Sequence, residues 1–147
     1  MKVSSGTAII WGKKILLCHP TNTSWKNTFS LPKGGVEPNE STIDAAIRET
    51  FEECGIVIDK SQIVKKGDGS ILRPMVIDYV DKKGVKFKTC WVYVVQITDL
   101  SEIGLVSDVL DQSMLQISEV DWAGFLDYGE GCVKIFHRFL PILDLIK

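Results

Sequence analysis

Residues 34–56 read GGVEPNESTIDAAIRETFEECGI, and their spacing predicts one helix with two different faces. At about 100° per residue, the side chains of such a helix separate into arcs. One arc carries residues that suit a protein core: Ile43, Ala46, Ile47, Thr50 and Cys54. A second arc, about 130° away, carries Glu49, Glu52 and Glu53. We therefore expect one face of the helix in the core and the other at a site of chemistry.

Both ends of this helix are marked by residues that commonly end helices. Ser41 is a candidate N-cap, and Asp44 three residues later gives an aspartate version of the capping box. Gly55 supplies the left-handed residue with which many helices end. The sequence therefore predicts a helix of about three and a half turns between these two caps.

The clustered glutamates repel one another unless a cation neutralises them. Arg48 stands four residues before Glu52 and attracts it, whereas Glu49 stands four residues before Glu53 and repels it. Mg²⁺ suits such a cluster, because it prefers carboxylate, carbonyl and water oxygens, with substrate phosphates completing its shell. Zinc is disfavoured, since no histidine or cysteine belongs to the acidic arc. The alternative is an acidic helix face that is merely solvated.

The order of these residues resembles a known family pattern. Gly34 is followed after five residues by Glu40, and after seven more by Arg48 and the run ETFEECGI. This resembles the Nudix box, Gx5Ex7REUxEExGU, in which U is a bulky aliphatic residue. Every Gly, Glu and Arg of the pattern is present, and the one departure is Thr50 at the first U position. Thr50 lies on the predicted buried arc, where a small, half-apolar side chain is tolerable.

The resemblance implies a Mg²⁺- or Mn²⁺-dependent hydrolase that cleaves a nucleoside diphosphate linked to another moiety. The metal ligands and the source of the general base would be the three clustered glutamates, and which of them is the base stays open. The carbonyl of Gly34 would join the metal shell, Arg48 would orient a glutamate by ion pairing, and Glu40 would support them. The chemistry agrees, because a pyrophosphate anion repels hydroxide and needs cations and a proton-accepting carboxylate for hydrolysis.

Composition predicts one ordinary domain over residues 1–147. The chain is 45% hydrophobic, which is enough to bury a core, and its net charge of −2 argues against a broad nucleic-acid footprint. No apolar run approaches the length of a membrane span, and the N-terminus lacks the long apolar region of a signal peptide. We therefore expect a cytoplasmic protein without a membrane partner. The four cysteines have no CxxC spacing and predict reduced thiols, mostly in the core.

Outside the helix, β-branched and alternating runs predict several strands. We expect strands over residues 3–11, 14–19, 28–31, 56–58, 63–66, 75–80, 85–97 and 120–125. The run 85–97 is long and β-branched, so we expect it to be central, and apolar spacing predicts a second helix over residues 131–146. This order predicts an α/β (α+β) fold with a mixed β-sheet between helices. It fits the αβα sandwich that the Nudix resemblance implies.

Nudix proteins commonly carry a further metal-binding or catalytic glutamate six residues before a tryptophan on a late strand. Counting back from Trp122 gives Gln116, where an amide replaces the carboxylate. Glu119, Asp111 or Asp108 in the same loop could take its place. Gln116 and Glu119 are therefore candidates for a further metal ligand or base, and the alternative is that both are ordinary loop residues.

Substrate contacts are expected from the loops. Trp25 could stack on a base, and Lys33 and Arg73 could bind phosphates, with His19 a weaker candidate. Packing of Trp25 against the sheet, and plain solvent exposure of Lys33, are the alternatives.

The pattern LPKGGVEPNE is shared by Nudix proteins with several substrates, so the substrate stays open. Our first expectation is dinucleoside polyphosphates such as diadenosine polyphosphates, or related dinucleotides such as ADP-ribose. An RNA 5′ end or an inositol pyrophosphate is the alternative substrate, and a non-catalytic nucleotide-sensing module is the alternative function. Nucleic acid is otherwise an unfavoured partner. The resemblance also allows a homodimer, for which no segment marks an interface.

Overall fold

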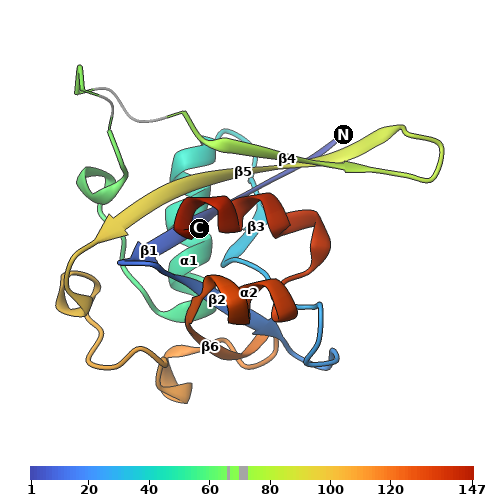
Figure 1. Ribbon diagram of the computed structural model, residues 1–147. Helices are drawn as coiled ribbons and strands as arrows, with labels where there is room; N and C mark the ends of the chain where they lie inside the picture. Colours follow the sequence, from blue (N-terminus) through green and yellow to red (C-terminus); the bar gives the residue numbers. More distant parts are fainter. Residues whose placement is uncertain (66, 70–72) are drawn as a thin grey trace.

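A mixed β-sheet runs through the computed structural model, which describes residues 1–65, 67–69 and 73–147 (Figure 1). Within these residues its strands are β1 (Lys2–Trp11), β2 (Lys14–Pro20), β3 (Lys33–Gly35), β4 (Met75–Val80), β5 (Lys86–Ile97) and β6 (Val120–Asp127). They follow the order β4-β5-β1-β2-β6, and the short β3 pairs with β1. β1 runs parallel to β5, whereas the other strand pairs are antiparallel. The expected mixed sheet is therefore confirmed.

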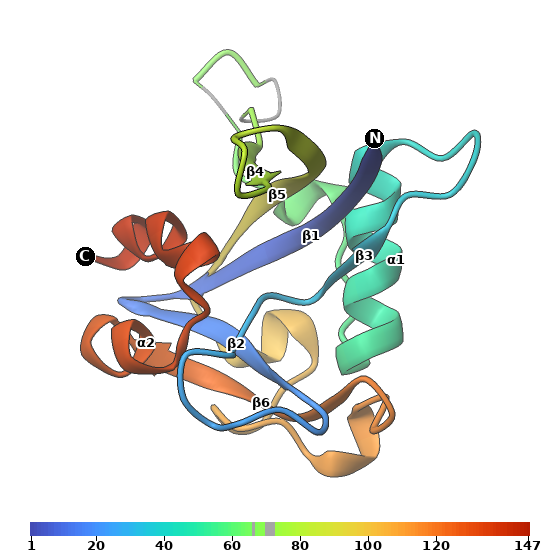
Figure 2. The same ribbon diagram turned by 90° about the vertical axis from the view of Figure 1, so that its right-hand side faces the viewer.

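Helical segments cover both faces of this sheet. Helix α1 (Thr42–Cys54) lies against one face, and α2 (Tyr128–Lys134) with the 3₁₀ segment η4 (His137–Ile146) lies against the other (Figure 2). Short 3₁₀ turns connect the remaining elements: η1 (Lys60–Gln62), η2 (Leu100–Ile103) and η3 (Gln112–Met114). None of the helices among the described residues is long and apolar enough to cross a membrane.

Strand alternation divides the core into two halves. Ile9 on β1 points into the half beneath α1, whereas its neighbour Ile10 points into the half beneath η4. Phe139 and Ile142 of η4 fill the second half. The cysteines are all free, and three of the four are buried, as the sequence predicted.

Helix α1 has the ends that the sequence predicts. The Ser41 hydroxyl accepts a hydrogen bond from the Asp44 N–H at 3.1 Å, and Gly55 adopts a left-handed φ of 69°. The carboxylate of Asp44 pairs instead with Lys60, 3.1 Å away, so the structure gives only the Ser41 half of the capping box. Thr50 is fully buried, as expected from its arc.

The C-terminal region differs from the single helix predicted over residues 131–146. The α-helix ends at Lys134, and residues 137–146 form a 3₁₀ helix that contains Pro141. Proline has no N–H, and in an α-helix its ring would clash with the carbonyl four residues earlier. The apolar spacing was real, since both segments pack on the sheet, but the helix type and its continuity were wrong.

Three short predicted strands are reduced or absent. Residues 56–58 form no strand, and residues 28–31 contribute only isolated bridges at Phe29 and Ser30. Ile63 makes an isolated bridge to Val95, while Lys66 of the predicted strand 63–66 lies outside the described residues. β5 is internal, as its composition suggested, but β1 occupies the middle position of the sheet.

Candidate active site

Arg48 organises the acidic face of α1. Its Nε and Nη2 atoms donate to the two carboxylate oxygens of Glu40 at 2.8 and 2.9 Å, which is a bidentate contact. Its Nη1 atom donates to Glu49 at 2.8 Å and to Glu52 at 3.2 Å. Nη2 also donates to the carbonyl oxygen of Gly35 at 2.9 Å. One guanidinium therefore fixes three carboxylates and ties α1 to β3.

These contacts set the ionisation of the cluster. The hydrogen bonds from Arg48, followed by the backbone N–H of Glu37, lower the pKa of Glu40 to about 2. The carboxylates in turn raise the pKa of Arg48 above its usual value, with Glu40 contributing most. Burial raises the pKa of Glu49 even though Arg48 opposes the shift. Glu49 is thus a partly desolvated carboxylate that a cation would stabilise.

β3 brings Gly34 directly against Glu49. In the antiparallel pairing of β3 with β1, Gly34 is opposite Ser5 and faces α1. A Cβ atom built on Gly34 would overlap the Glu49 carboxylate. Only glycine lets the backbone approach the carboxylate this closely.

Glu53, one turn along the helix from Glu49, lies deeper in the structure. Its carboxylate accepts a hydrogen bond from the backbone N–H of Lys33 at 3.1 Å. Burial, more than any other cause, raises the pKa of Glu53 to about 7, and Glu49 and Glu119 add to the rise. Glu53 and Glu119 line a cavity of about 140 Å³ with Lys33 at its edge. Glu53 and Glu119 therefore share this cavity, whereas Glu49 and Glu52 do not line it.

The carboxylates of α1 suit a hard divalent cation. Glu49 and Glu53 are carboxylates partly withdrawn from water, and Gly34 brings its backbone against Glu49 without a side chain. Mg²⁺ needs only one or two protein carboxylates, because it keeps several waters and takes substrate phosphates. In the part of the chain that the structure describes, no three acidic, histidine or cysteine side chains enclose a ready-made site. The residues therefore fit an open site of the Mg²⁺ type and not a closed structural one.

Comparison with known proteins places this geometry in a family. The sequence matches the family model of the NUDIX domain over residues 2–111, which is most of the chain. The chain belongs to the Nudix family. Glu40, Arg48, Glu49, Glu52 and Glu53 thus stand in a Nudix box whose side chains contact one another as described above.

Relatives and solved structures agree on the fold. An RNA pyrophosphohydrolase of Bartonella henselae is 40% identical over 48 residues, which cover 32% of this chain and 28% of that protein. A MutT Nudix hydrolase from Burkholderia pseudomallei superposes with a TM-score of 0.69 at 20% identity, covering 99% of this chain and 98% of that one. A C. elegans Ap4A hydrolase superposes with a TM-score of 0.61 at 22% identity, covering 99% and 93%. Nudix hydrolases generally need divalent metal ions.

Outside the Nudix box, Gln116 and Glu119 were the candidates for a further metal ligand or base, and the structure places their side chains differently. The backbone of Gln116 donates to the Glu53 carbonyl at 3.0 Å and accepts from Glu119 and Val120, both at 2.8 Å. The side chain of Gln116 is exposed and does not line the cavity, whereas Glu119 does. Counting back six residues from Trp122 therefore locates the turn at Gln116. The carboxylate that lines the cavity is that of Glu119, three residues later.

Trp25 stacks on a buried histidine. The rings of Trp25 and His19 lie 3.6 Å apart at an angle of 6°, and the indole is 52% exposed. His19 Nδ1 lies 2.5 Å from an Asp121 oxygen, and Nε2 lies 3.0 Å from the Ser24 carbonyl. Sequence reasoning missed Asp121, because 102 residues separate it from His19 and no local pattern links them.

The remaining candidates are dispersed. Lys33 lines the cavity at Glu53, and its ammonium lies 5.5 Å from the centroid of the Phe139 ring, beneath η4. Arg73 is exposed just before β4 and does not line this cavity. The structure thus brings Lys33, Glu53 and Glu119 together and leaves Arg73 apart.

Proposed function

We propose that this chain is a divalent-metal-dependent pyrophosphohydrolase that acts on a nucleotide-type diphosphate, with residues 1–147 working as one domain. The observation that carries the proposal is the pair of desolvated carboxylates on α1, Glu49 against the bare backbone of Gly34 and Glu53 on the backbone N–H of Lys33. Bound Mg²⁺, or Mn²⁺ in its place, would neutralise the phosphate oxygens and lower the pKa of a bound water.

The residues of the Nudix box divide the remaining work. Glu49, Glu52 and Glu53, with the Gly34 carbonyl, would hold the metal, and Arg48 would keep Glu49 and Glu52 oriented through the contacts described above. Glu53 is the candidate to accept the proton of the attacking water, because it shares the cavity with Glu119 and is held by the backbone N–H of Lys33. Glu119 shares the cavity and would add a further carboxylate.

For the substrate we propose a nucleotide whose base stacks on the open face of Trp25. The stack on His19 holds the indole in one orientation at low entropic cost, and base stacking on an aromatic face is worth about 1–3 kcal/mol. Dinucleoside polyphosphates are the first candidate and an RNA 5′ end is the second. The RNA pyrophosphohydrolase relative supports the second, although the aligned segment spans only 28% of that protein.

The experiment is product identification with Mg²⁺ over diadenosine tetraphosphate, ADP-ribose and a 5′-triphosphorylated RNA. Glu53→Gln and Glu52→Gln are expected to lower the rate by orders of magnitude. Glu130→Gln on α2 removes the same charge away from the site and should retain the wild-type rate. Equal turnover in wild type and both site variants would refute the proposed roles, and no turnover of any substrate would favour a nucleotide-sensing module.

A further inference from the structure

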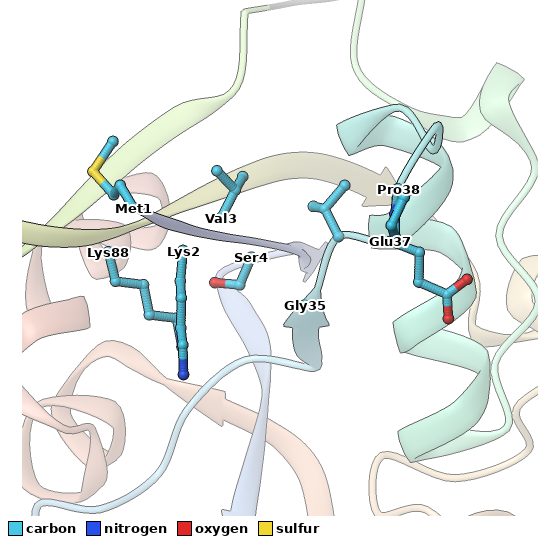
Figure 3. A pocket seen from close by; sticks show the side chains of 9 residues that line it. Met1, Lys2, Val3, Ser4, Gly35, Glu37, Pro38 and Lys88 are labelled. Atoms are coloured by element: carbon cyan, nitrogen blue, oxygen red, sulfur yellow. The ribbon is translucent and has the colours of Figure 1, made fainter.

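A second cavity opens beside the start of β1, next to the Nudix box. It has a volume of about 530 Å³, and its lining includes Lys2, Ser4, Gly35, Glu37 and Lys88 (Figure 3). The carbonyl of Gly35 accepts the hydrogen bond from Arg48, so this residue belongs both to the cavity and to the framework of the box. The cavity therefore lies next to the residues that Arg48 holds in place.

Sheet register places two positive charges side by side in it. Lys2 and Lys88 are direct partners in the parallel pairing of β1 with β5, and Figure 3 shows their side chains extending in the same direction. Like charges that stand opposite each other on neighbouring strands are destabilising. Neither lysine makes a salt bridge with a described carboxylate. Lys86, two residues from Lys88, does have such a partner in Asp78, 3.3 Å away.

Further cations surround this pair. Burial lowers the pKa of the Lys88 amine, and the nearby charges of Lys33, Lys2 and Arg138 lower it further. Among the described residues that line the cavity, the one acidic residue is Glu37, whose carboxylate lies 3.9 Å from Arg48 and is largely exposed. The local charge is therefore positive, although the whole chain carries a net charge of −2.

A buried hydroxyl with only a weak polar neighbour also faces this region. Ser4 is 1% exposed, and within the described residues its Oγ atom has no nitrogen or oxygen partner, although the thiol of Cys90, its partner on β5, lies beside it. Its neighbour Ser5, on the other face of β1, bonds the carbonyls of Thr42 and Trp91. A thiol is a weak hydrogen-bond partner, so a ligand oxygen would satisfy this buried hydroxyl better than Cys90 does. In Figure 3 the Ser4 oxygen lies on the same side of β1 as the two lysine side chains.

We propose that this cavity is a phosphate subsite, in which Lys2, Lys88 and Ser4 bind a phosphate of the substrate other than the two joined by the cleaved bond. This inference rests on the proposed function and names the class of substrate. Substrates with three or more phosphates, or with a phosphodiester next to the diphosphate, fill the subsite. ADP-ribose, which has two phosphates, leaves it empty.

Binding of inorganic tripolyphosphate to the metal-free protein tests the subsite without catalysis. We expect Lys2→Gln/Lys88→Gln to raise the dissociation constant at least tenfold in calorimetric titrations. The matched control Lys82→Gln/Lys86→Gln removes two positive charges from the neighbouring β4–β5 hairpin. It should change the dissociation constant for tripolyphosphate less than twofold. Equal weakening in both double variants would mean that net charge alone binds the anion, and would overturn the proposal. Far-ultraviolet circular dichroism establishes that each variant is folded.

Substrate preference tests the same subsite in turnover. The ratio of kcat/KM for diadenosine tetraphosphate to that for ADP-ribose should fall at least tenfold in Lys2→Gln/Lys88→Gln. The same ratio with a 5′-diphosphorylated dinucleotide, whose one phosphate beyond the diphosphate is the phosphodiester, shows whether the extra phosphate comes from a polyphosphate bridge or an RNA backbone. Unchanged ratios for both substrates would overturn the proposal. Failure of every protein to hydrolyse any substrate, with tripolyphosphate binding still weakened in the cavity variant, would refute the hydrolase and support the subsite.

Discussion

Arg48 shows how one side chain can position several others. Its guanidinium offers a planar fork of donors, so it can hold both oxygens of Glu40 while it contacts Glu49 and Glu52. An isolated, exposed pair such as Lys14 and Asp108, 4.0 Å apart, contributes little to stability. The Arg48 network instead orients three carboxylates of the Nudix box, those of Glu40, Glu49 and Glu52.

Position 34 has no room for a side chain. Gly34→Ala would place a Cβ atom on the Glu49 carboxylate, which would have to leave its position beside β3. We expect this variant to lower kcat/KM at least a hundredfold and to weaken Mg²⁺ binding measured by calorimetry. Gly129→Ala, whose added Cβ would make an ordinary contact at 3.6 Å, is the control for the general cost of the substitution. Wild-type Mg²⁺ affinity in Gly34→Ala would show that the close approach to Glu49 is not needed.

Glu53 should make the stability of the metal-free protein depend on pH. Its pKa rises from 4.5 to about 7 on folding, so ionisation favours the unfolded chain. The stabilisation that protonated Glu53 gives the folded state is fully present below about pH 4.5, and it is lost as the pH rises through about 7. Since one pKa unit is about 1.4 kcal/mol and the shift is from 4.5 to about 7, the loss is at most about 3.5 kcal/mol.

Urea unfolding of the metal-free protein at several pH values measures this effect. The wild type should lose stability relative to Glu53→Gln as the pH rises from about 5 to about 8, because the amide cannot ionise. Glu130→Gln, on an exposed part of α2, provides the comparison for loss of a carboxylate elsewhere. Parallel pH profiles for wild type and Glu53→Gln would contradict the burial of an ionisable Glu53.

Helix α1 could be predicted almost completely because its signals are local. Ser41, Gly55 and the 3.6-residue period fix its ends and its two faces within one short segment. Thr50 departs from the aliphatic Nudix pattern, and the structure explains the departure. Its hydroxyl donates to the Ala46 carbonyl at 2.7 Å and lies 2.8 Å from the hydroxyl of Thr7 on β1. This polar contact joins the helix to the middle strand.

Restoring the aliphatic residue should therefore destabilise the protein. Thr50→Val keeps the shape of the side chain but leaves the fully buried Thr7 hydroxyl without its partner. We expect the free energy of unfolding in urea to fall by about 1–2 kcal/mol. Thr7→Val/Thr50→Val removes both partners and should recover most of this loss. Independent, additive effects of the two substitutions would show that the hydroxyls are not coupled.

Elements that depend on distant partners could not be predicted. The backbone N–H groups of Thr28 and Phe29 bond the carbonyl of Lys134, more than a hundred residues later, so their run is not a regular strand. Glu119 enters the cavity because the turn at Gln116 is bonded to the end of α1. Local spacing finds a motif, but the cavity around it depends on contacts between segments that are far apart in the sequence.

Charge in the whole molecule is separated in a way that composition hides. The net charge is −2, yet the carboxylates gather on the α1 side of β3 and unpaired lysines gather around the cavity beside β1. Such a separation suits a substrate that is itself a chain of negative charges, because cations are provided by the protein at one end and by a metal at the other. Gly35 of β3 joins the two regions, because it lines the cavity and accepts the hydrogen bond from Arg48.

The same separation predicts that Mg²⁺ stabilises the whole molecule. A ligand that binds only the folded state adds about 2.7 kcal/mol at a hundred times its dissociation constant. For a chain of this length, that corresponds to a rise in Tm of about 5–10 °C in calorimetric scans at constant ionic strength. Chelation of the metal should reverse the rise. Glu53→Gln should show a smaller dependence of Tm on Mg²⁺, whereas Glu130→Gln should follow the wild type. An equal Mg²⁺ dependence in all three proteins would show that the ion acts elsewhere than at the carboxylates of α1.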